Sequence, residues 1–248
     1  MAIFSMKTQS ISRSKGNNAV AASAQRRSTK LKDSASGLSH DFLKYKNNSI
    51  RMHSEISVSS EAPAWVRAFS ELHTFDPNAA TEKLWNLVES TEKRKDSQLA
   101  REVIISLPRE LNDEAKIMLV REYVSSQFTV LGMVADWSIR FKNINPQVMI
   151  MLTYREVLPE GFGQKVRAWN DNALHKVWRE QWADHANRHL LKNGVKSRIY
   201  HRSNRKRCID LIPTKHLGKA VMEMEQRWIE ADRMREHQEI QKENLRRI

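Results

Sequence analysis

The sequence predicts an α+β fold, with a central antiparallel sheet, flanking helices and a helical C-terminal third. Strand patterns gather in the first part of the chain and helix patterns in the last, an order typical of α+β proteins. The stretch from Gly132 to Val157 contains two apolar strands around a polar turn. A strong amphipathic helix pattern follows from Ala168 to Asn193. The 248 residues are enough for one large domain or one domain with a helical extension.

The two apolar strands are expected over Thr129–Arg140 and Val148–Tyr154. Both segments are almost continuously apolar, which suits strands that are covered on both faces. Asn143, Asn145 and Pro146 lie between them, and these residue types favour turns and resist continued pairing. We therefore expect a hairpin at the centre of the sheet.

Three further strands are expected from alternating or β-branched segments at residues 2–12, 51–59 and 102–107. Helices are expected at residues 19–25, from Pro63, and at 78–95, 112–126, 168–193 and 219–247. The chain then divides into a sheet domain at 1–165, a helical subregion packed on it at 166–227, and a charged C-terminal helix at 228–248.

Basic residues outnumber acidic ones. Lys and Arg total 42 against 29 Asp and Glu, so the formal net charge is +13. Such an excess recruits phosphate by counterion release, so nucleic acid is the first partner to consider, with a membrane surface or plain solubility as alternatives. Cys208 is the single cysteine, which excludes an intramolecular disulfide. The first residues lack a signal-peptide pattern and no segment approaches the ~20 apolar residues of a membrane span, so we expect a cytoplasmic protein.

Two basic clusters are candidates for binding a phosphate backbone. The first is interleaved with serines and asparagines, which also donate to phosphate oxygens, and it contains Arg13, Lys15, Arg26, Arg27, Lys30 and Lys32. The second contains His201, Arg202, Arg205, Lys206 and Arg207. A solvated surface loop is the alternative for the first cluster. Together they favour a nucleic-acid partner more strongly than either does alone.

Several other residues have plainer interpretations. His185 and His189 share a helical face at the spacing of zinc proteases, but the residue after the first is Ala rather than Glu, so two solvent-facing histidines are expected. Trp178 and Trp182 have helical spacing, which favours core packing over stacking on bases. Glu102 opens a buried strand, where it either orients a ligand or acts as a base, or is the polar end of a strand that reaches solvent.

Several blocks of sequence together carry a family resemblance. In chain order they include SRSKGNNAVAASA, EAPAW, LWNLVE, GMVADWSI, MLTYREV, GFGQKVRAWN, WREQWADHAN and HRS. From about Met1 to Arg227 the chain resembles the MobA/MobL family of relaxases, the plasmid mobilisation proteins. The resemblance implies a relaxase, HUH-endonuclease-like fold with histidines on adjacent strands of the sheet. It implies nicking of single-stranded DNA at a transfer origin, where a tyrosine attacks a phosphate held by a divalent metal, Mg²⁺ or Mn²⁺. It also implies accessory relaxosome proteins as partners.

Four positions depart from the family pattern. The family's AAAYR-like run is ASAQR here, so Gln25 stands at the tyrosine position. The family's VADLAIH-like run is VADWSIR, so Arg140 stands at one histidine position. The family's NPHAH is NPQVM, so Gln147 and Met149 stand at the other two. An amide cannot attack phosphate as tyrosine does, and an amide, a thioether and a guanidinium are poor ligands for Mg²⁺ or Mn²⁺.

We therefore expect a relaxase-family protein that binds single-stranded origin DNA, holds no metal and does not nick by the tyrosine–metal route. Arg140 would pair with a phosphate directly, and Glu102 is a candidate for supporting the catalytic positions. The residues expected to bind DNA are Arg13, Lys15, Arg26, Arg27, Arg140, Arg202, Arg205 and Arg207. Two alternatives stay open. One is an active nickase that uses Tyr45, Tyr123, Tyr154 or Tyr200, and the other is a non-catalytic scaffold protein of the relaxosome.

Overall fold

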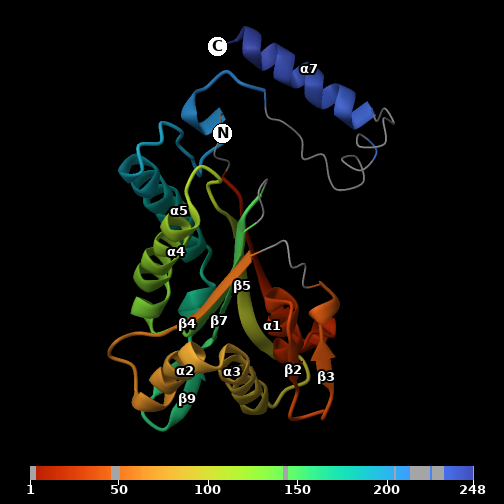
Figure 1. Ribbon diagram of the computed structural model, residues 1–248, viewed down its shortest axis with the longest axis vertical. Coiled ribbons are helices and arrows are strands. Elements are labelled where there is room, and N and C mark those ends of the chain that lie inside the picture. Colours follow the sequence, from red (N-terminus) through yellow and green to blue (C-terminus); the bar gives the residue numbers. More distant parts are fainter. Residues whose placement is uncertain are drawn as a thin grey trace. The chain divides into compact units, whose positions relative to one another are not determined.

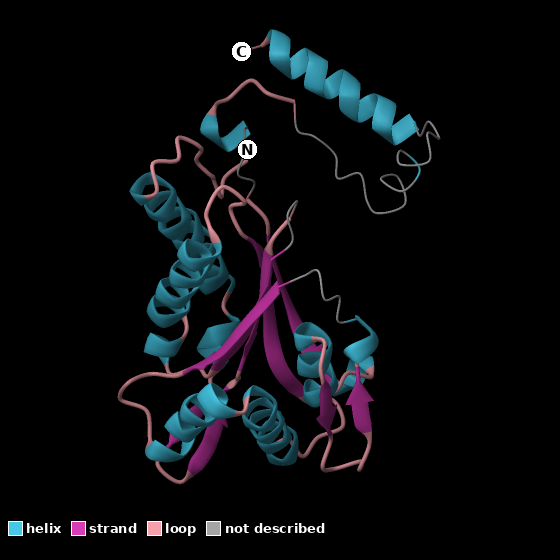
Figure 2. Ribbon diagram, in the orientation of Figure 1, coloured by secondary structure: helices cyan, strands magenta, loops and turns pink. Residues whose placement is uncertain are grey.

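The predicted hairpin lies inside a five-stranded antiparallel sheet, the organising element of the computed structural model. The structure describes residues 4–45, 51–141, 145–203, 205–212, 224 and 232–247. The strand order is β1-β5-β7-β6-β4. The strands are β1 (Met6–Ser12), β4 (Arg51–Ser57), β5 (Gln98–Ser106), β6 (Ala135–Phe141) and β7 (Gln147–Leu152). β7 is the middle strand and β6 is its neighbour, so the central hairpin is confirmed. Figure 2 shows the long central strands between two groups of helices.

Helices cover both faces of the sheet (Figure 1). The covering helices are α1 (Ala19–Arg27), α2 (Ala64–Phe75), α3 (Pro77–Thr91), α4 (Asp113–Gln127) and α5 (Asn172–Lys192). A further helix, α7 (Asp232–Arg246), belongs to a separate compact unit. One core joins α4 and α5 to the sheet and includes Ile150. A second core joins α1, α2 and α3 to the other face and includes Met151. Successive strand residues point to opposite faces, which explains why the hairpin is apolar throughout. The α+β class is confirmed.

Side-chain caps begin these helices where the sequence places Asn or Asp. Asn18, Asp76, Asn112 and Asp171 each accept a hydrogen bond from a backbone N–H in the first turn of the helix that follows. These bonds satisfy donors that have no partner within the helix. The predicted starts of α1, α3 and α4 therefore agree with the structure to within about one residue, as expected for cap-defined ends.

The structure corrects several boundaries. The segment before β6 is a 3-10 turn, η3 (Thr129–Leu131), which ends at Gly132 with φ of 87°, so the strand begins at Ala135 rather than Thr129. A small hairpin pairs β8 (Arg155–Leu158) with β9 (Gly161–Lys165). A second small hairpin pairs β2 (Lys30–Lys32) with β3 (Ser39–Asp41). Asn143 of the central turn lies outside the described residues.

The chain forms two compact units, residues 1–199 and residues 200–248. The first unit extends to Ile199 because α5 shares a core with the sheet. The sequence-based prediction placed domain boundaries after residues 165 and 227. The second unit contains the turn η5 (Arg205–Arg207) and α7. The helix predicted over residues 219–247 is described from Asp232 on, and most of its first part, residues 219–231, lies outside the described residues. None of the described helices is long and apolar enough to span a membrane.

Candidate nucleic-acid interface

One face of the sheet carries an unusual number of polar side chains near one strand end. Strand register places residues of neighbouring strands in rows, and residues of one row share a face. One row is Ser106, Gln147, Arg140 and Met52. The next is Lys7, Ile104, Met149, Ser138 and Ser54. A third is Gln9, Glu102, Met151, Asp136 and Ile56. Three of the four substituted family positions therefore lie in two adjacent rows.

Helix α1 is held over the third row by buried ionic contacts. Asp136 is 4% exposed and accepts hydrogen bonds from Arg27 Nη2 at 2.6 Å and from Ser23 Oγ at 2.8 Å. Glu102 is 1% exposed and pairs with Arg26 of α1 and with Gln9 of β1. Glu102 therefore does not reach solvent at a strand end. It positions α1 through Arg26, and both of its oxygens already have partners.

The C-terminus of α1 brings the fourth substituted position to the same place. Arg140 Nη2 donates to the backbone carbonyl oxygens of Gln25 at 2.7 Å and Arg26 at 3.1 Å, and to Ser28 Oγ at 3.2 Å. The last carbonyls of a helix have no partner within it and carry partial negative charge, so a cation there is favourable. Ser28 ends the helix in the left-handed conformation at φ 50°. Gln25, Arg140, Gln147 and Met149 thus meet at one end of the sheet.

The charge on Arg140 is not balanced by an acid. Among the described residues no carboxylate forms an ion pair with Arg140, and its Nε is buried without a hydrogen-bond partner. Burial, and the positive charge of nearby Arg26, lower the pKa of Arg140. Ser138, two residues before it on the same face, also has a buried hydroxyl without a partner in the described chain. A half-buried cation beside an unsatisfied hydroxyl is a favourable setting for an anion.

The donor set at these positions does not fit Mg²⁺ or Mn²⁺. Both ions prefer oxygen or imidazole ligands, whereas this place offers the Met149 thioether, the Gln147 amide and a permanent cation, Arg140. Within the described ranges, no group of three or more His, Cys, Asp or Glu side chains is arranged to hold a metal ion.

The fold places the residues of the first basic cluster in different surroundings. Arg13 pairs with Glu89 and donates to the carbonyl of Glu92 at 2.6 Å. Arg26 and Arg27 serve the buried contacts of α1. Each of these three arginines thus contacts an acidic residue of the fold, and their role in binding DNA stays a prediction. Lys15 is exposed and lies near the opposite end of the sheet from Arg140. Two residues before it, the backbone N–H of Arg13 donates to the carbonyl oxygen of Ser97, just before β5.

The second basic cluster belongs to the other unit. Arg205 and Arg207 lie in η5, and the Arg207 guanidinium sits 3.4 Å from the centre of the Tyr200 ring. Arg202 directs its Nε toward His201 at 3.3 Å. These residues keep their predicted role as a proposal, carried by a unit distinct from the sheet.

The histidine and tyrosine candidates are mostly buried. His185 and His189 are each 6% exposed and contact Ser126 and Glu122, so the expectation of solvent-facing histidines is wrong. α5 buries these histidines against α4, in addition to its tryptophans. Helical spacing alone does not predict that the histidines are buried. Tyr123 is fully buried and burial raises its pKa well above the usual value, and Tyr154 is 4% exposed. Tyr200 is about half exposed, and the side chain of Tyr45 lies outside the described part of the chain.

Sequence reasoning missed two polar residues of this face. Lys7 is exposed, shares a row with Met149, and forms no ion pair with another described residue. Ser138 sits within the apolar run of β6. The alternation of strand residues could have identified Ser138, because Ser138 and Arg140 are two residues apart and must share a face. The place of Lys7 depends on the pairing of β1 with β5, which only the fold shows.

Known proteins resemble this chain over most or all of its length. The MobA/MobL family pattern matches residues 17–227. The conjugal transfer protein TraA of Agrobacterium fabrum is 34% identical over 275 residues, which cover 100% of this chain and 24% of that protein. The mobilization protein MobL of Acidithiobacillus ferridurans is 30% identical and covers 100% of this chain and 70% of that protein. A solved structure described as the molecular basis of vancomycin resistance transfer in Staphylococcus aureus is 29% identical, with a TM-score of 0.70 over 82% of this chain and 100% of the other.

Proposed function

Because the chain belongs to the MobA/MobL family, we propose that it binds single-stranded DNA of a plasmid transfer origin at the face that carries Arg140. We propose further that it does not nick this DNA by tyrosine attack on a metal-bound phosphate. The chain spans 24% of the length of the TraA relatives, so the proposal concerns this segment and not the activity of the complete proteins. Accessory relaxosome proteins are the expected protein partners.

The observation that carries the proposal is the unbalanced charge of Arg140. A DNA phosphate would supply the missing counter-charge, and Arg140 Nη1 forms no hydrogen bond to a described residue and can donate to it. Lys7 is exposed on β1, in the next row of the same face, and its ammonium can contact a neighbouring phosphate. The Ser138 hydroxyl is buried next to Arg140 and does not reach solvent. The Gln25 side chain is exposed at the end of α1, where its amide can hydrogen-bond to DNA but cannot form a phosphodiester adduct.

Replacing Arg140 with glutamine is expected to weaken binding of a single-stranded origin oligonucleotide by about 10-fold or more. A hydrogen bond to a charged group contributes about 1.5–3 kcal/mol, and about 1.4 kcal/mol corresponds to a factor of ten. Fluorescence anisotropy at fixed salt measures the effect. Arg188→Gln is the matched control and removes the same positive charge. Arg188 is an exposed residue of α5, and its side chain has no hydrogen bond or ion pair to another described residue.

Arg140 also holds the end of α1, so a change in folding must be separated from a change in binding. Arg140→Lys keeps the charge and is expected to recover part of the affinity that Arg140→Gln loses. Thermal unfolding of each variant reports whether the fold is intact. If folded Arg140→Gln protein binds as tightly as the wild type, the proposed interface is wrong.

No covalent protein–DNA adduct is expected when the wild-type chain is incubated with origin DNA and either Mg²⁺ or Mn²⁺. The tyrosine position holds Gln25, and the donor set near it does not fit these ions. Denaturing electrophoresis with labelled DNA detects an adduct. Its appearance would overturn the second half of the proposal, and mass spectrometry of the linked peptide would identify the tyrosine that replaces the family nucleophile.

A further inference from the structure

A basic groove of about 800 Å³ lies at the opposite end of the sheet from Arg140. The end of α3, the start of β5, the β8–β9 hairpin and the turn η4 (Arg167–Asn170) enclose it. Five cations line the groove against two carboxylates, Glu92 and Asp96, which leaves an excess of three positive charges. The cations are Lys93, Arg94, Arg155, Lys165 and Arg167.

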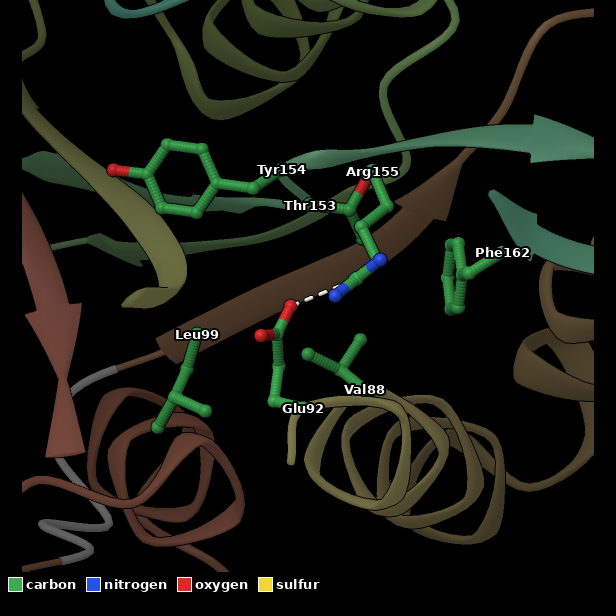
Figure 3. A pocket seen from close by; sticks show the side chains of 7 residues that line it. All are labelled: Val88, Glu92, Leu99, Thr153, Tyr154, Arg155 and Phe162. Atoms are coloured by element: carbon green, nitrogen blue, oxygen red, sulfur yellow. Dashed lines mark hydrogen bonds and ion pairs between the residues drawn. The ribbon is translucent and has the colours of Figure 1, made fainter. Parts of the chain in front are cut away.

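One buried carboxylate is shared by two of these cations. Glu92 receives Arg155 Nε at 2.7 Å and Lys165 Nζ at 2.9 Å (Figure 3 shows the contact with Arg155). Burial works against ionisation of Glu92, but the hydrogen bonds from Arg155 and Lys165 outweigh it and hold the pKa of this carboxyl below its usual value. Glu92 is therefore charged, and it balances only one of its two partners.

Two further cations of the groove have no acidic partner. Lys93 and Arg167 are exposed, and neither forms an ion pair or a hydrogen bond with another described residue. Arg94 is balanced by Asp96 at 2.8 Å. The groove therefore presents unpaired positive charge toward solvent, and such a concave surface attracts polyanions.

A buried guanidinium, that of Arg101, lies behind the turn η4 and adds to the positive charge of the groove. Arg101 is 6% exposed, donates to the Trp169 carbonyl at 2.7 Å and to the side chain of Asn170, and has no carboxylate partner among the described residues. Asn170 itself lines the groove. The electrostatic field of Arg101 therefore reaches the groove through the turn η4. Protein has a lower dielectric constant than water, so it screens this field less.

We propose that this groove binds the phosphate backbone of a second segment of DNA, beyond the segment at Arg140. The inference rests on the proposed DNA-binding function. Unpaired cations and uncharged donors such as Ser97, Gln98 and Gln164 are the groups that contact phosphate oxygens without reading sequence. The exposed Lys15 lies two residues after Arg13, whose backbone N–H donates to the carbonyl of Ser97, so Lys15 extends the positive surface at the same end.

The Arg140 site and the groove are far enough apart to contact DNA independently. Ser106 shares the row of Arg140, and Gln98 begins the same strand at the groove. Eight residues of strand span about 26 Å at about 3.3 Å per residue. Removing charge at the two places should therefore change the binding free energy additively.

The test uses Lys93→Gln/Arg167→Gln and a 20-nucleotide single strand, with the dissociation constant measured over a series of salt concentrations. Each single-strand phosphate contact contributes about 0.7 to the slope of log K against log salt, so the double variant should lower the slope by about 1.4. Lys176→Gln/Arg188→Gln removes the same charge from exposed positions of α5 that lack a partner among the described residues, and its slope should stay near that of the wild type.

The outcomes separate the groove from the first proposal. If Arg140→Gln weakens binding while the groove variant keeps the wild-type slope, the groove proposal is wrong and the DNA-binding proposal stands. An equal loss in the α5 control would also overturn the groove, because it would show a general effect of net charge. If the wild type itself shows no salt-dependent binding, both proposals fail.

A direct contact measurement completes the test. Cys208 is the single cysteine, so Cys208→Ser/Gln164→Cys allows one photo-crosslinker to be attached at the groove. We expect crosslinking to the 20-nucleotide strand from this position and none from Cys208→Ser/Arg188→Cys. Equal crosslinking from both positions would contradict the groove.

Discussion

Replacing Asp136 with alanine is expected to lower the free energy of unfolding by about 3–5 kcal/mol, because removing one partner of a buried ion pair leaves an uncompensated charge. Asp136 is 4% exposed and receives Arg27 Nη2 at 2.6 Å, Ser23 Oγ at 2.8 Å and Trp85 Nε1 at 2.7 Å. Burial opposes ionisation of Asp136, but Arg27 and these hydrogen bonds hold its pKa below the usual value. Without the carboxylate, the Arg27 guanidinium remains buried and unbalanced.

Equilibrium denaturation in urea measures the loss, and a surface pair provides the matched control. Asp96 pairs with Arg94, and both side chains are more than half exposed. Asp96→Ala should therefore change the free energy of unfolding much less than Asp136→Ala does, because an exposed ion pair contributes little to stability. A loss for Asp136→Ala no larger than that of the control would show that the Asp136 network does not hold α1 on the sheet.

The same network should make the protein less stable as the pH falls from about 6.5 to about 4. Burial and the neighbouring Arg27 guanidinium lower the pKa of His73 to about 4. Arg27 Nη2 lies 2.9 Å from His73 Nε2, so this nitrogen accepts and the imidazole is neutral. The unfolded chain takes up a proton near pH 6.5, before the folded protein does, so the stabilisation is complete above that pH and is lost below it. At about 1.36 kcal/mol per pKa unit, the loss approaches about 3 kcal/mol.

His73→Gln is the variant that isolates this effect, because glutamine keeps an acceptor near Arg27 and does not titrate. The difference in unfolding free energy between pH 7.5 and pH 4 should be smaller in the variant than in the wild type. It should not vanish, because burial also lowers the pKa values of His175 and His185. An unchanged pH dependence would mean that His73 is not held neutral by Arg27.

These two predictions concern the contacts that place the proposed DNA interface. Asp136 and Arg140 lie on the same face of β6, and α1 joins them, since its residues Ser23 and Arg27 contact Asp136 while its last carbonyls contact Arg140. Loosening the network should therefore weaken DNA binding as well as stability. Asp136→Ala should lower affinity for the single strand even though Asp136 itself is buried away from solvent.

The central hairpin, the start of α1 and the core positions of Trp178 and Trp182 all follow from local sequence. Continuous apolar runs, an N-terminal cap and helical spacing act over a few residues, so they can be recognised without the fold. The four substituted positions were also recognisable, because they interrupt motifs that are otherwise matched. Their meeting at one end of the sheet was implied by the family resemblance and is seen directly in the strand register and in the contact of Arg140 with α1.

The tertiary structure determined which partner each basic side chain contacts. Arg26, Arg27 and Arg140 are alike in sequence, but Arg27 meets its acid Asp136 at a separation of 109 residues, whereas Arg140 finds backbone carbonyls 114 and 115 residues away and no carboxylate among the described residues. The groove likewise joins Lys93 to Arg167, which are far apart in the chain. Charge patterning along a sequence predicts that a polyanion binds, but pairing depends on distance in space. Only the fold therefore distinguishes the cations that stabilise it from those left for DNA.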